Sequence, residues 1–202
     1  MQRINFNFNF DYKKATQGLN HFALKAGGQI SKLKALKLIY LADRYHLRKY
    51  GRLITNDIYF AMNLGPVPSG VKDIAEASRF LGKKEKDYAP KYLTSKTAYN
   101  LQSVKPVDES VFSDSDIEAL DFIWNKFGHL KRYQLADLTH KYPEWKRHEQ
   151  ALNLNSRIQM DLEDFFNDPD SDVEKCFELN EQDRATRREH LEEMILLESL
   201  WR

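Results

Sequence analysis

The sequence predicts a mainly α-helical protein, a compact helical domain with one or two small β-hairpins and a helical C-terminal extension. Apolar residues recur at helical spacing in most of the longer segments. Short alternating stretches bounded by Gly, Pro or Asn interrupt them. The 202 residues are 42% hydrophobic and 30% charged, which is typical of a globular chain with a real core. Collagen-like, mucin-like and wholly disordered classes are excluded.

The first half contains the clearest helices. Residues 4–10 alternate between apolar residues and Asn, which is typical of a short edge strand or of a loosely packed segment. Asp11 is a good N-cap for a helix over 12–26, which Gly27-Gly28 ends. Ser31 then caps a helix over 32–50 that ends at Gly51. This helix is apolar round much of its circumference, so we expect it to be central and buried.

Strands and turns dominate the next part of the chain. Residues 53–60 read as two extended arms about the turn 55–57, and 65–70 read as a stiff proline connector. Ser69 is expected to cap a helix over 70–81. The charged run 83–87 predicts a solvated loop, and 91–105 predict a hairpin.

The second half is expected to be helical. Ser115 to Glu118 have the spacing of a capping box ahead of a helix that ends near Gly128. Further helices are predicted over 131–142, 156–167 and 181–201. An acidic breaker at 168–172 separates the last helix from the rest.

The net charge of +1 conceals a strong asymmetry along the chain. Residues 1–107 hold 19 Lys and Arg against 7 Asp and Glu, a net +12, whereas residues 108–202 hold 12 against 23, a net −11. The two halves can attract each other within one protein, the basic half can meet an acidic partner or nucleic acid, or both can form solvated faces that partly neutralise each other.

Two groups of residues are candidates for a site on the central helix. Asp43 and His46 are three residues apart, a spacing that permits general acid–base chemistry but is commoner in a structural hydrogen bond. A basic stripe follows one side of the helix, where it can track phosphates, meet acidic side chains or form a solvated edge. The stripe consists of Lys34, Lys37, Arg44 and Arg48, extended by Lys32, Lys49 and Arg52.

The sequence indicates no cofactor, metal or membrane partner. His140, His148 and Cys176 lack a recognised metal-ligand spacing. The prolines at 66 and 68 remove N–H donors that a phosphate loop needs. No apolar run approaches the ~20 residues that span a bilayer, and residues 1–10 do not resemble a signal peptide, so we expect a cytoplasmic protein.

Residues 37–74 resemble the Panacea antitoxin domain, the SocA-like, phage-associated family. The resemblance extends over roughly residues 12–147, with a weaker match at Leu135, Thr139-His140 and Trp145. Leu53 and Asn56 depart from the family pattern, which commonly has Pro and Gly there. The motif residues are Tyr40, Asp43, His46, Tyr50, Thr55, Asp57, Tyr59, Gly65, Pro66, Pro68 and Ser69.

The resemblance implies a mainly helical, non-enzymatic domain over 1–147 that neutralises a cognate protein toxin by direct binding. The acidic helical extension over 148–202 lies outside the match. One family member looks like an adaptor that delivers its toxin to a protease, so the resemblance also allows a protease complex as a partner. The alternative function is a nucleic-acid-binding regulator that uses the basic N-terminal half, and an enzyme acting through Asp43 and His46 is third.

Overall fold

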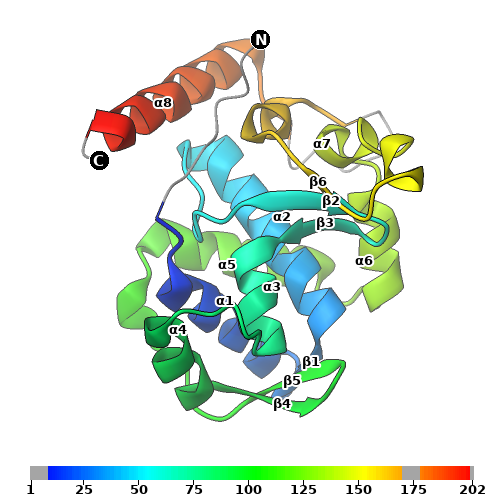
Figure 1. Ribbon diagram of the computed structural model, residues 1–202. Coiled ribbons are helices and arrows are strands. Elements are labelled where there is room, and N and C mark those ends of the chain that lie inside the picture. Colours follow the sequence, from blue (N-terminus) through cyan, green and yellow to red (C-terminus); the bar gives the residue numbers. More distant parts are fainter. Residues whose placement is uncertain (1–8, 170–177, 201–202) are drawn as a thin grey trace.

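The computed structural model describes residues 9–169 and 178–200. Helix α2 (Lys32–Tyr50) runs through the middle of the protein, and the other elements surround it (Figure 1). Every residue from 35 to 48 is buried, so the prediction of a central helix is confirmed. The helix ends at Gly51, whose φ of 76° lies in the left-handed region that favours glycine.

Several helices pack against α2, and three of them make the most extensive contacts. Asp11 caps α1 (Tyr12–Lys25), as predicted, because its carboxylate accepts hydrogen bonds from the N–H groups of Lys13 and Lys14. The others are α5 (Asp114–Phe127) and α6 (Arg132–Thr139). The capping box of α5 is formed by Ser113 and Asp116, so its predicted start at Ser115 was two residues late. A mainly helical fold is consistent with this arrangement.

One small antiparallel sheet closes the end of the protein near the start of α2 (Figure 1). The hairpin of β4 (Leu93–Thr97) and β5 (Asn100–Ser103) lies within the predicted range 91–105. Strand β1 (Gln29–Ser31) adds to β5 and was not predicted, because three residues are too few to show an alternating pattern.

A second antiparallel sheet has the order β3-β2-β6. Strand β2 (Tyr59–Met62) pairs with β3 (Gly65–Pro68), and β6 (Ile158–Gln159) pairs with the other edge of β2. The hairpin therefore lies later than the predicted arms at 53–60, and the expected proline connector is a strand. Prolines are tolerated there because β3 is an edge strand, so an N–H facing away from β2 is not needed.

Two short helices follow this hairpin. Helix α3 (Ser69–Glu76) ends at Ala77 with a left-handed φ of 50°, which makes it shorter than the predicted 70–81. Its N-cap is Pro68 rather than Ser69. Helix α4 (Lys83–Tyr88) occupies the run predicted as a loop. This run shows no apolar stripe in the sequence, in keeping with a helix that buries none of its residues. Helix α4 contacts the body through Tyr88, whose ring packs edge-on against the ring of Tyr12 with centroids 5.7 Å apart. Short 3-10 turns follow at η1 (Ala89–Lys91) and η2 (Glu109–Val111).

Residues 148–167, which we assigned to the extension, are part of the main body. The predicted helix over 156–167 is wrong, because β6 and the 3-10 helix η4 (Leu162–Phe166) occupy this range. Phe165 and Phe166 are fully buried. Phe165 lies edge-on to Tyr40 and Tyr59, at 5.8 and 5.2 Å, so the second half completes the core around α2. The remaining elements here are α7 (Pro143–Lys146) and η3 (Ala151–Asn153).

The last helix, α8 (Glu181–Leu200), lies along the end of the body opposite α4 and β4 (Figure 1). It contacts α2 and η4, and its Leu191 is buried with 1% exposure. The strand predicted at 4–10 falls almost wholly outside the described residues, as do positions 170–172, Cys176 and position 201. Among the described helices, none is both long and apolar enough to cross a membrane.

Candidate functional site

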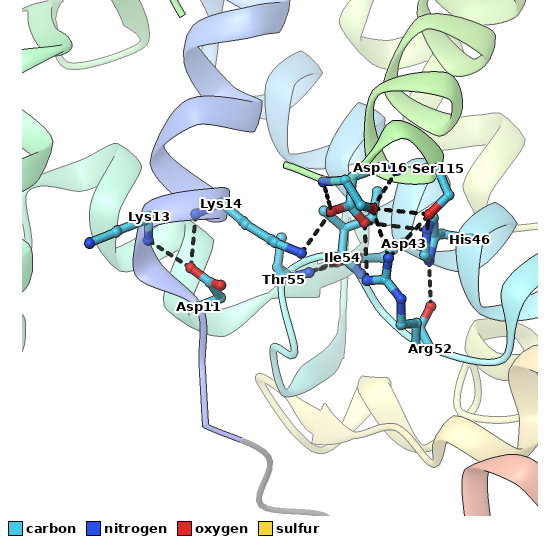
Figure 2. Close-up of polar contacts among 11 residues, drawn as sticks. Asp11, Lys13, Lys14, Asp43, His46, Arg52, Ile54, Thr55, Ser115 and Asp116 are labelled. Carbon is cyan, nitrogen blue, oxygen red and sulfur yellow. Dashed lines mark hydrogen bonds and ion pairs between the residues drawn. The ribbon is translucent and has the colours of Figure 1, made fainter. Parts of the chain in front are cut away.

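Asp43 joins α2 to the segment that follows it. Its Oδ1 accepts hydrogen bonds from the N–H groups of Ile54 and Thr55, at 2.6 and 3.0 Å (Figure 2). Its Oδ2 accepts from the hydroxyls of Thr55 and Tyr59. Burial raises the pKa of Asp43, while these donors favour the carboxylate. The aspartate therefore acts as a rigid junction between helix and hairpin.

His46 does not pair with Asp43, so the predicted hydrogen bond between them is wrong. Its Nδ1 donates to the carbonyl of Arg52 at 2.8 Å, and its Nε2 lies 3.0 Å from the hydroxyl of Ser115 (Figure 2). Burial lowers the pKa of His46 to about 4, so the ring is neutral at pH 7 and Nε2 accepts from Ser115. The carboxylate of Asp116 is neutralised instead by Lys14 at 2.7 Å and Arg52 at 3.1 Å.

Asp57 fixes the hairpin to the start of α3. Its carboxylate accepts hydrogen bonds from the N–H groups of Gly70 and Val71, both at 2.8 Å, and from that of Ile58 at 2.7 Å. Two of the free N–H groups in the first turn of α3 are thereby satisfied. Burial raises the pKa of Asp57 to about 7 against the effect of these donors.

Lys37 supports the outer edge of β3. Its Nζ donates to the carbonyl of Pro66 at 2.6 Å, and the side chain is fully buried. Burial lowers the pKa of Lys37 to about 7. Gly65 has a φ of 97°, and a Cβ there would lie 2.6 Å from the hydroxyl of Thr139 and 3.0 Å from Nζ of Lys37. The glycine and the prolines of this motif thus shape the contact between β3, α2 and α6.

Arg44 and Glu144 form a buried ion pair between α2 and α7. The Nε of Arg44 lies 2.6 Å from Oε1 of Glu144, and both side chains have 0% exposure. Tyr40 donates to the same oxygen at 2.5 Å, and Arg44 also donates to the carbonyl of Asn167 at 3.0 Å. The second half of the chain therefore satisfies this arginine.

Arg48 is held in the same way one turn later. It donates to the carbonyls of Phe165 and Asn167, at 3.0 and 3.2 Å, and pairs with Asp168 at 2.5 Å. The other carboxylate oxygen of Asp168 pairs with Arg184 of α8. Lys34 donates to the carbonyl of Gly128 at 2.5 Å.

Of the three alternatives for the basic stripe on α2, a solvated edge and a phosphate-tracking surface are therefore wrong, whereas contact with acidic side chains holds for Arg44 and Arg48. Lys37 and Arg44 have 0% exposure and Arg48 has 2%, so these cations make their contacts inside the protein. The cations on this side of α2 bind backbone carbonyls or carboxylates of other elements, which explains why so many cations are found on a buried helix.

The charge asymmetry has an intramolecular role. Lys14, Arg44, Arg48, Lys49 and Arg52 of the basic half all pair with Asp or Glu of the acidic half. Tyr50 adds a hydrogen bond to Glu118, which also pairs with Lys49. Attraction between the two halves is thus a feature of the folded chain. The sequence could not name Asp116, Glu118, Glu144 and Asp168 as partners, because contacts over such separations leave no local pattern.

Among the described residues, no group of three or more His, Cys, Asp or Glu side chains is placed to hold a metal ion. The ring of His140 stacks on Trp145, with centroids 3.9 Å apart, and Trp145 donates to the carbonyl of Met62. Cys176 lies outside the described residues.

These contacts define a class of protein: a helical domain in which polar side chains of one central helix bind the elements that surround it. The family model described as "Antitoxin SocA-like, Panacea domain" matches residues 36–146, more than half of the chain. The protein belongs to this family. A comparison with curated proteins and one with solved structures found no match.

Proposed function

We propose that this protein is an antitoxin that neutralises a cognate protein toxin by direct binding, without enzymatic activity and without a cofactor, in the cytoplasm. Membership of the antitoxin family carries the proposal. The polar motif supports it, because Asp43, His46 and Asp57 use their hydrogen-bonding atoms within the fold. These motif residues build a scaffold, and exposed side chains are left to contact the toxin.

Co-expression with the product of the neighbouring gene tests this function. We expect the neighbouring product to arrest growth alone, and this protein to restore growth and to co-purify with it. Failure of both rescue and co-purification would overturn the proposal. Rescue that depends on a host protease, together with loss of the toxin from cells, would identify delivery to a protease complex as the mechanism.

A nucleic-acid-binding regulator is the second candidate, and one surface favours it. Exposed Lys and Arg side chains follow the chain from the end of α3 through α4 to β4. Figure 1 shows α4 and β4 at the end of the body opposite α8. None of the cations of this surface forms an ion pair with any described residue, in contrast to Arg44, Arg48 and Lys49 of α2. The surface consists of Arg79, Lys83, Lys84, Lys86, Lys91 and Lys96.

A salt titration separates the two functions. Binding to a DNA or RNA duplex through these cations should weaken steeply and linearly in a plot of log affinity against log salt concentration. A toxin complex with an apolar centre should weaken less. Charge reversal at Lys83 and Lys84 should abolish nucleic-acid binding and leave toxin rescue intact if the antitoxin function is correct.

A further inference from the structure

The basic surface that extends from Arg79 to Lys96 carries two exposed aromatic rings. Phe80 lies at its start and Tyr99 just after its last lysine, and these residues are 75% and 73% exposed. Among the described aromatic residues, only these two and Tyr133 of α6 are exposed. Aromatic rings stabilise a fold when they are buried, so two rings left in solvent beside a group of cations indicate a binding surface.

Phe80 lies on a turn that is fixed between α3 and α4. Its N–H donates to the hydroxyl of Ser78 at 3.2 Å. Nζ of Lys86 donates to the carbonyl of Arg79 at 3.2 Å, which joins the turn to α4. The guanidinium of Arg79 lies 4.9 Å from the centroid of the Phe80 ring. A cation and an aromatic ring are therefore presented to solvent together.

Tyr99 lies in the turn between β4 and β5. Its carbonyl accepts a hydrogen bond from the N–H of Lys32 at 2.8 Å, and its N–H donates to the hydroxyl of Thr97 at 3.2 Å. These contacts fix the backbone and leave the ring in solvent. Helix α4 contacts η1, and η1 contacts β4, so the cations between the two rings follow one continuous part of the body.

The charge of this surface favours an anionic partner. Residues 79–96 hold six Lys and Arg against Glu85 and Asp87, a net +4. Lys and Arg that neutralise the phosphates of a nucleic acid release counterions, which drives binding. Unstacked bases also supply flat faces for the aromatic rings. An acidic protein segment would meet the cations but would leave both rings without such faces.

We propose that this surface binds single-stranded nucleic acid, with the phosphates along the lysines and bases stacked on the rings of Phe80 and Tyr99. This inference rests on the second candidate function, nucleic-acid binding. Every base has a face that stacks on an aromatic ring, so the binding tolerates many sequences. A duplex fits less well, because its bases already stack on one another and their faces are not accessible.

The test titrates a fluorescein-labelled oligodeoxythymidine with the full chain and measures fluorescence anisotropy. Phe80→Ala with Tyr99→Ala should weaken binding at least about tenfold, because two bases lose their stacking partners. Phe80→Tyr with Tyr99→Phe keeps both rings and should bind as the unchanged protein does. All variants should have the thermal unfolding midpoint of the unchanged protein, since both residues are exposed.

Tyr133→Ala is the matched control for the loss of an exposed ring. Tyr133 is 56% exposed, and the guanidinium of Arg132 lies 4.8 Å from the centroid of its ring, much as Arg79 lies over Phe80. It belongs to α6, outside the basic surface. The control should bind the oligonucleotide as the unchanged protein does.

Salt dependence separates stacking from charge. Lys83→Gln with Lys84→Gln should reduce the slope of log affinity against log salt concentration by about 1.4, since each phosphate contact on a single strand contributes about 0.7. The variant without the two rings should keep the slope of the unchanged protein. An oligouridine that binds more tightly than the oligodeoxythymidine would identify RNA as the ligand, and the reverse order would identify DNA.

Unchanged affinity of the variant without the two rings would overturn the inference and leave the nucleic-acid function standing. Equal affinity for the oligodeoxythymidine annealed to its complement would do the same. Absence of binding to any nucleic acid would overturn both. Loss of toxin binding in Lys83→Gln with Lys84→Gln, when the unchanged protein binds no nucleic acid, would assign the surface to an acidic face of the toxin instead.

Discussion

Arg44 of α2 and Glu144 of α7 meet at 2.6 Å in the interior, with neither side chain exposed to solvent. A buried charge that loses its partner costs far more than an exposed one, because no water replaces the lost contact. This pair therefore makes the basic half of the chain depend on the acidic half for stability.

Glu144→Gln should lower the free energy of unfolding by about 3–5 kcal/mol, because Arg44 keeps its charge in the interior without a counter-charge. Urea denaturation measures this change. Glu76→Gln is the control: it breaks the exposed pair between Lys72 and Glu76, at 2.5 Å, and should cost less than about 0.5 kcal/mol. Equal effects of the two substitutions would contradict the structural role of the buried pair.

Gly51→Ala should detach α8 from α2. The left-handed φ of 76° costs a residue with a Cβ about 1–2 kcal/mol, and the new methyl group would strike the ring of His190. Gly27→Ala is the control that carries the backbone cost alone, since Gly27 has a φ of 83° and no atom lies within 4 Å of a Cβ placed there. We expect proteolysis within α8 to accelerate only in Gly51→Ala. Equal proteolysis of both variants would show that the contact with His190 does not secure the helix.

Asp43→Ala should destabilise the protein by several kcal/mol, because the N–H groups of Ile54 and Thr55 and the hydroxyl of Tyr59 lose their acceptor inside the core. Asp43→Asn should cost less, since its amide oxygen can still accept from both N–H groups while its NH₂ faces hydroxyls that accept. Thermal unfolding ranks the two variants. An Asp43→Asn protein of unchanged stability that fails to rescue growth would indicate a direct role in toxin binding.

Stability should fall with acidification through His46. Its pKa is about 4 in the folded protein and 6.5 in an unfolded chain, so the unfolded state takes up the proton first. The contribution is complete above pH 6.5, declines as the pH falls towards 4, and amounts to about 3 kcal/mol at 1.36 kcal/mol per pKa unit. Urea denaturation between pH 4 and 7 should show this slope, and His46→Gln should lack it. An identical slope in His46→Gln would assign the acid sensitivity to other groups.

A fragment of residues 1–147 should fail to fold, although the family match ends at 146. It lacks β6 and the rings of Phe165 and Phe166, which are fully buried. A fragment of residues 1–169 retains them and should unfold cooperatively in calorimetry at a lower midpoint than the full chain. A cooperative transition of the 1–147 fragment would show that the rest of the body only covers a finished core.

Local patterns predicted the elements that depend on local physics. The apolar periodicity of residues 32–50 and the cap at Asp11 predicted α2 and the start of α1, because both signals are fixed within a few residues. Helix α4 was missed because it has no apolar stripe, and β6 because its two residues are a strand only through pairing with β2.

The site was predicted less well than the fold. The motif residues round Asp43 were recognised, but the burial of Arg44 and Arg48 follows from contacts with residues 100 to 123 positions away. A sequence pattern shows that a helix side is basic. It does not show whether that side faces water or the carbonyls of a distant turn.

The separation between Arg48 and Asp168 also has a kinetic consequence. The two residues are 120 positions apart, and closing a loop of that length must precede the ion pair that rewards it. Helical proteins rich in local contacts fold in microseconds to milliseconds, whereas those that rely on distant pairings are slower. Refolding followed by stopped-flow fluorescence should therefore be slow for a mainly helical chain.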